Sequence, residues 1–229
     1  SSRFRPLPLT GNHSLSTLGH LGISTQMAGN LAAAPSGCCV GWGIPFQVGE
    51  VVALKDRAVH VPLDPLKAQW LVFMHTSDLR PVEPGPDGFI SPTRGQGQLG
   101  EHAADYAICY SDGTEERALI HRRHQIGAFQ RCWGENCFEA VSHTKPHTLA
   151  SPSVQPTRFW GLFQMRVWAA DGGSWVNWLW AWQNPHPDKE IVGIRFEPVS
   201  GIVIVSAVSA GTASSLPLVW RPRRKACLK

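Results

Sequence analysis

The stretch KAQWLVFMH, residues 67–75, decides the fold class. Its apolar side chains fall on both faces of an extended chain, so we expect a central strand that is covered on each side. Further strand-like segments follow along the chain, most of them alternating between apolar and polar residues and separated by turns rich in glycine and proline. The expected strands are 58–63, 67–75, 104–111, 116–121, 158–168, 175–183, 190–197 and 201–208.

The turns between these segments support the same fold class. The sequence SDGT at 111–114 predicts a β-hairpin, because Asp-Gly is the strongest short hairpin signal. The sequence NPHPD at 184–188 ends a strand, because proline lacks the N–H that a sheet ladder needs. Only 14–18 and 26–34 tolerate a helix, and glycine or proline interrupts both. Many short strands without a long helix predict an all-β jelly-roll sandwich.

Composition and charge exclude several classes of partner. The 229 residues are 43% apolar and 17% charged, which is enough to bury the core of one large β domain. The net charge of +4 comes from five basic residues among the last nine, and the rest of the chain carries −1. A terminal basic run is typical of a solvated tail, so we expect no nucleic-acid partner. No apolar run reaches the ~18 residues that a membrane span needs, so we expect no membrane partner.

The same features predict how the chain is organised. We expect an N-terminal extension at 1–37, the β-sandwich module at 38–220, and a basic linker or truncated tail at 221–229. Both ends resemble cuts from a larger multidomain protein. The six cysteines do not form a disulfide framework, so they leave the compartment open.

Several motifs in order resemble a known family. They are GIPF at 43–46, AQWLVFMHTS at 68–77, YAICYSDG at 106–113, WQNPHPDK at 182–189 and the segment 191–196. This series resembles the galactose-binding-domain-like β-sandwich modules attached to large bacterial glycoside hydrolases and related multidomain proteins. The resemblance implies a jelly roll and favours an extracellular or periplasmic location. Such modules variously bind sugars, bind calcium or brace a catalytic domain, and the matched motifs carry over no binding residue.

The sequence predicts no catalytic residue. It contains no nucleophile elbow, zinc-protease helix, phosphate-binding loop or dinucleotide fingerprint. A glycosidase needs two carboxylates at a fixed separation, and no spacing in this chain singles out such a pair. His75 ends the central strand, where we favour a packed histidine over a catalytic base.

Two groups of residues carry side chains that could hold a metal ion. Cys132, Cys137, His143 and His147 are zinc-type ligands, but their spacing is not that of a zinc finger, so we favour a plain loop without zinc. The Asp-Gly pairs at 112–113 and 171–172 offer hard oxygens, which leaves a structural calcium open. We favour the hairpin-turn interpretation of these pairs, and we expect no cofactor.

The ten tryptophans are the most informative residues for function. Trp178, Trp180 and Trp182 share one face of one strand, and such a stripe is more typical of sandwich core than of a sugar ladder. Other tryptophans lie beside glycine or a turn, and we expect these to be exposed. The predicted saccharide-binding residues are Trp133, Trp160 and Trp175, with Arg158 and Asn136 as polar neighbours.

These observations predict a non-catalytic accessory module that binds carbohydrate. Its expected partner is a glycan or a neighbouring domain of the same polypeptide. The first alternative is a purely structural domain that braces a neighbouring catalytic domain. The second alternative is a hydrolase that acts on glycans.

Overall fold

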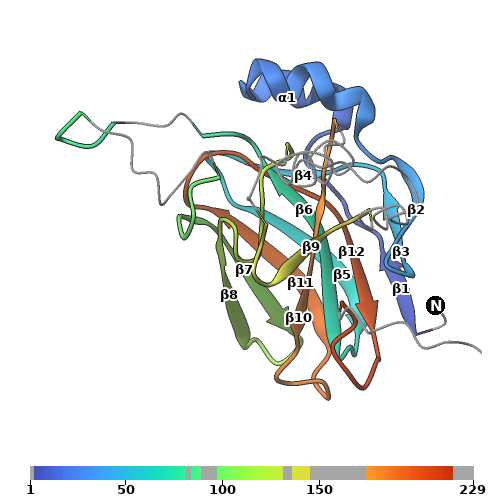
Figure 1. Cartoon of the computed structure of the whole chain (residues 1–229). Helices are drawn as coiled ribbons and strands as arrows, with labels where there is room; N and C mark the ends of the chain where they lie inside the picture. Colours follow the sequence, from blue (N-terminus) through green and yellow to red (C-terminus); the bar gives the residue numbers. More distant parts are fainter. Residues whose placement is uncertain (1–2, 81–83, 89–96, 131–135, 145–173, 219–229) are drawn as a thin grey trace, which may run out of the picture.

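Two main antiparallel β-sheets form the framework of the computed structural model (Figure 1). The structure describes residues 3–80, 84–88, 97–130, 136–144 and 174–218. The larger sheet has the order β1-β12-β6-β10-β9, and β4 also pairs with β12. Its strands are β1 (Phe4–Leu7), β4 (Val52–Leu54), β6 (Trp70–Ser77), β9 (Ala140–Ser142), β10 (Trp178–Gln183) and β12 (Val203–Gly211).

The smaller sheet has four strands in the order β5-β11-β7-β8. They are β5 (Val59–Leu66), β7 (His102–Tyr110), β8 (Glu115–His121) and β11 (Ile191–Pro198). A separate hairpin pairs β2 (Gly37–Gly41) with β3 (Ile44–Val48). Three short helical segments precede this hairpin, namely η1 (Leu15–Leu21), α1 (Thr25–Asn30) and η2 (Leu31–Ala33).

The core forms two layers, one on each face of the larger sheet. Leu71 and Phe73 of β6 pack between the two sheets, whereas Val72 and Met74 pack on the opposite face with residues of β3 and α1. All eight residues of β6 are buried. The expected central strand, covered on both sides, is therefore confirmed.

The all-β prediction is confirmed, and the fold is sandwich-like. The SDGT turn joins β7 to β8 as expected, with Gly113 at φ 81°, a left-handed conformation that suits glycine. The two helix-tolerant stretches fall in the helical segments that precede β2. The expected strand 158–168 lies outside the described residues. Among the residues described, no helix is long and apolar enough to cross a membrane.

The N-terminal segment takes part in the sandwich. β1 pairs with β12 over four residues, with Phe4 opposite Gly211. A Cβ atom at Gly211 would lie 2.1 Å from the Phe4 ring, so glycine is what allows this close approach. Residues before the expected boundary at 38 thus supply an edge strand of the larger sheet.

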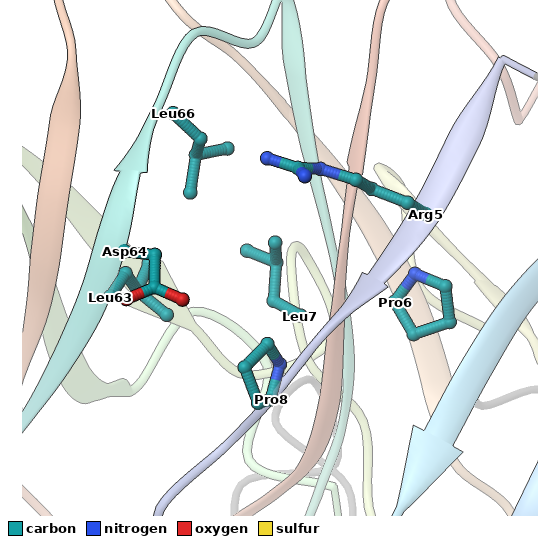
Figure 2. A pocket seen from close by; sticks show the side chains of 7 residues that line it. All are labelled: Arg5, Pro6, Leu7, Pro8, Leu63, Asp64 and Leu66. Carbon is teal, nitrogen blue, oxygen red and sulfur yellow. The ribbon is translucent and has the colours of Figure 1, made fainter.

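The edge strands of the two sheets define two sides of the sandwich, and in the larger sheet β1 and β4 share one edge by pairing with different parts of β12. β1 of the larger sheet and β5 of the smaller sheet line a shared hollow on one side. β8 and β9 are the opposite edges, and the chain runs from one to the other through residues 122–139. The candidate site described below lies on the β8–β9 side, away from the hollow between β1 and β5 (Figure 2).

Candidate functional site

The structure brings together few of the predicted saccharide-binding residues. Trp133, Arg158 and Trp160 lie outside the described residues. Asn136 is exposed in the segment that precedes β9. Trp175 is also described, and its surroundings differ from those expected.

Trp175 is buried, with only 4% of its surface exposed. The backbone N–H of Val176 donates to the carbonyl of Phe129 at 2.7 Å, and this bond holds the Trp175 ring 5.5 Å from the Phe129 ring. Its indole N–H donates to the side chain of Asn177 at 3.3 Å. The expectation that Trp175 is exposed is therefore wrong. Saccharide binding by the five residues stays a prediction.

The tryptophan stripe on β10 behaves as core. Trp178 and Trp180 are 3% and 7% exposed and belong to the cluster between the sheets, and the partly buried Trp182 packs against that cluster. The Trp178 indole N–H donates to the carbonyl of Ala128 at 2.9 Å. The core interpretation is confirmed for this stripe.

A row of four rings lies on the β8–β9 side, and we call it the ring platform: His102, His121, His124 and Phe138. The His102 and His121 rings stack at 5.1 Å, because the two residues are register partners in β7 and β8. His121 meets His124 edge to face at 6.4 Å, and His124 meets Phe138 at 5.1 Å. Phe138 is 73% exposed, so the row ends in an aromatic ring open to solvent.

Backbone bonds fix the platform in place. The N–H groups of Phe138 and Glu139 donate to the carbonyls of Arg123 and His124, both at 3.0 Å. Arg123 adopts φ 62°, which lets the chain turn sharply directly after β8. The segment before β9 is thereby held along the turn that carries the histidines. The exposed Asn136 lies two residues from Phe138 in this segment.

The polar groups of the platform can both donate and accept hydrogen bonds. His102 Nε2 lies 2.5 Å from Asp105 Oδ1 and donates to it, which fixes the orientation of that ring. Among the described residues, the ring nitrogens of His121 and His124 have no hydrogen-bond partner. A neutral imidazole presents one donor and one acceptor, so both rings can bond to hydroxyl groups.

The two arginines nearest the platform on the smaller sheet already form ion pairs. Arg117 pairs with Asp105 at 2.9 Å and also with Glu197. Arg195 pairs with Glu115 at 2.8 Å and with Glu197 at 2.7 Å. These ion pairs engage the arginines on the outer face of the smaller sheet, so the rings of the platform and their nitrogens are the groups that remain for a ligand.

His75 is a packed histidine, as expected. Its side chain is fully buried, with Nε2 2.9 Å from the Gln125 carbonyl and Nδ1 2.8 Å from the Tyr106 hydroxyl. Burial lowers the pKa of His75 to about 4, against the raising effect of the bond to Gln125. A neutral imidazole sealed in the core has no access to a substrate.

Of the four candidate zinc ligands, the structure describes Cys137 and His143. Cys132 and His147 lie outside the described residues. His143 Nδ1 accepts a hydrogen bond from the N–H of Asn177 at 3.1 Å. In the described part of the chain, no group of three or more histidine, cysteine or acidic side chains is placed to hold a metal ion.

The carboxylate of Asp112, in the turn between β7 and β8, is already bound by other groups of the protein. Asp112 accepts hydrogen bonds from the N–H and hydroxyl of Thr114 and pairs with Lys189 at 2.7 Å. The bond to Lys189, reinforced by those from Thr114, holds the pKa of this carboxyl well below its usual range. These contacts support the hairpin interpretation of this Asp-Gly pair.

Sequence reasoning missed the ring platform. Its rings come from three separate segments, and only the β7–β8 register brings His102 beside His121. One local signal is present, because Phe138 is an aromatic residue in a loop between Asn136 and Glu139.

Comparisons with known proteins assign no family to the chain. No family model matches it, and a search of curated proteins found no similar sequence. The sandwich-like fold is compatible with the β-sandwich module that the motifs resemble. The likeness to galactose-binding domains rests on the motifs alone.

Proposed function

We propose that this chain is a non-catalytic carbohydrate-binding module with a galactose-binding-like jelly roll, and that it contacts its ligand at the ring platform. The observation that carries the proposal is Phe138, a large aromatic ring that is 73% exposed yet held against His124. Contiguous exposed apolar surface is a common mark of a binding site, and the exposed Phe138 ring continues the row of three histidine rings.

The chemistry of the platform fits a sugar ring. One face of a pyranose is lined with C–H groups, which pack against an aromatic ring and bury apolar area. The hydroxyl groups at the rim of the sugar need donors and acceptors, and the ring nitrogens of His121 and His124 supply both. The exposed Asn136 lies two residues before Phe138 in the same segment, and its side-chain amide can both donate and accept hydrogen bonds.

A glycan array followed by calorimetric titration of the best ligand tests this proposal. We expect Phe138→Ala to weaken binding at least about tenfold, which corresponds to ~1.4 kcal/mol. Val40→Ala is the matched control, because Val40 is 71% exposed on β2 and lies outside the platform. This control should bind as the wild type does. Equal affinities for Phe138→Ala and the wild type would contradict the proposed site.

The exposed Phe138 also favours one alternative, a structural module whose neighbouring domain covers this ring. That alternative predicts no glycan binding on the array. It also predicts that Phe138→Ala lowers the unfolding temperature of a longer polypeptide containing the neighbour and leaves that of the isolated module unchanged. The two outcomes separate carbohydrate binding from domain support.

A further inference from the structure

The β2–β3 hairpin has an outer edge to which a further strand can be added. β2 pairs with β3, and within the described residues no other strand pairs with it. The two-residue turn at 42–43 has positive φ at both positions, as in a type I′ turn, so Gly41 and Ile44 form the hydrogen-bonded pair that closes the hairpin. Hydrogen-bonded and non-hydrogen-bonded pairs then alternate along β2. The N–H and C=O groups of Cys38 and Val40 therefore point away from β3.

Pro45 of β3 supports this direction. It lies opposite Val40 and has no N–H to donate, which suits a non-hydrogen-bonded pair. Its carbonyl accepts a hydrogen bond from the Ser209 hydroxyl of β12 at 2.7 Å, so this group faces away from β2. In the part of the chain that the structure describes, the outward backbone groups of Cys38 and Val40 have no hydrogen-bond partner. These groups are the ones that an added strand would bond.

β2 also lacks the features that keep edge strands from pairing with other chains, namely proline, charged residues or very short length. It has the sequence GCCVG, five residues with neither proline nor charge. Its exposed side chains are Cys38 and Val40, and Val40 is 71% exposed. The other edge strands each carry a protective feature: Pro6 in β1, Pro62 in β5, Glu115 in β8, and a length of three residues in β4 and β9. The edge of β2 is therefore the one suited to pairing.

We propose that β2 pairs with β2 of a second copy of this chain, antiparallel and across a two-fold axis at Cys39. The strand is nearly symmetric about this residue, with a glycine at each end and one outward-bonding residue on each side. Cys38 then forms a hydrogen-bonded pair with the partner's Val40, and the axis repeats this pair, so the outward backbone groups of both strands are satisfied. Because the strand is uncharged, it meets its own copy without like-charge repulsion. One patch thus serves both subunits, as a two-fold dimer requires.

Sedimentation equilibrium of the whole chain from about 10 µM to 1 mM tests the dimer. One short strand edge is a small interface, so we expect a reversible dimer that forms within this range. Val40→Lys should weaken dimerisation at least about tenfold, because it brings two like charges together across the axis. The matched control is Val199→Lys, which adds the same charge at a valine that is 51% exposed directly after β11 and should dimerise as the wild type does. A monomer at every concentration, or equal weakening by both variants, overturns the proposal.

Amide hydrogen exchange followed by NMR tests the edge in the unsubstituted protein. The N–H groups of Cys38 and Val40 should exchange at least about twofold more slowly at about 1 mM than at about 50 µM, because the dimer protects them. Those of Cys39 and Gly41, which already bond to β3, should exchange slowly at both concentrations. Slow exchange of Cys38 and Val40 that does not change with concentration overturns the proposal, because the edge is then covered within one chain. Phe138→Ala should leave the dimer intact, and loss of the dimer in that variant would place the contact at the ring platform instead.

Discussion

Acidification should destabilise the protein through His75, and the structure supplies the size of the effect. His75 is fully buried on β6. The Gln125 carbonyl can only accept, so Nε2 carries the hydrogen and Nδ1 accepts from the Tyr106 hydroxyl. The folded protein therefore holds a neutral imidazole. Burial lowers the pKa of His75 from its ordinary value of 6.5 to about 4.

The sign and magnitude follow from proton linkage. Between pH 6.5 and about 4 the unfolded chain binds a proton at His75 and the folded protein does not. The free energy of unfolding is therefore unaffected by His75 above pH 6.5 and falls as the pH drops below it. The difference between the two pKa values corresponds to about 3 kcal/mol, and about 2 kcal/mol of this is lost by pH 5.

Urea unfolding followed by tryptophan fluorescence at a series of pH values measures this effect. We expect His75→Gln to be less stable than the wild type at pH 7 and to lose less stability on acidification. The difference between the two curves isolates His75 from other groups, including His143, whose pKa burial also lowers. His20→Gln, at an exposed histidine, should keep the wild-type dependence. Parallel curves for the wild type and His75→Gln would refute the reasoning.

Three further substitutions test the packing, each measured by urea unfolding against the wild type. Trp178→Ala should lower the free energy of unfolding by about 3–5 kcal/mol, because it leaves a cavity in the core between the sheets. A loss below ~1 kcal/mol would contradict that packing. Arg122→Met should lower the free energy of unfolding by about 1–3 kcal/mol, because the carbonyls of Asp78 and Ser200 lose their donor while Glu101 keeps its ion pair with Arg80. Unchanged stability would show that these contacts are dispensable. Gly211→Val should lower the free energy of unfolding by about 1–3 kcal/mol, because the new side chain displaces Phe4. Unchanged stability would count against the close contact of β1 with β12.

The main strands could be predicted because their signals are local. The two-faced apolar pattern identified β6, and the Asp-Gly turn identified the β7–β8 hairpin. β1 and β4 were missed because strands of four and three residues carry too little alternation to be recognised. Their conformation is decided by pairing with β12, a partner more than 140 residues away in sequence.

The candidate sites were harder to predict because they depend on tertiary contacts. A position beside a turn indicated exposure for Trp175, yet the bond between Val176 and Phe129 draws that indole into the core. The ring platform needs His102 of β7 beside His121 of β8, and no local pattern reports that register. The sequence indicated which kinds of side chain were present. The order and register of the strands decided which of those side chains lie together.

The position of the ring platform at one side of the sandwich has a physical cause. The faces of the larger sheet are buried beneath the smaller sheet and beneath the β2–β3 hairpin and helices. The outer face of the smaller sheet carries ion pairs that satisfy their own charges. Edge strands differ, because they must be kept from pairing with other chains, and proline and charged residues serve that purpose.

The proline-bearing β1 and β5 fit this protective role, and exposed arginine on β1 contributes to it. Protection alone requires only that the edge be charged. It does not require an exposed aromatic ring that is held against a histidine at the β8–β9 side. That contrast is the physical reason for the proposal that the ring platform binds a ligand.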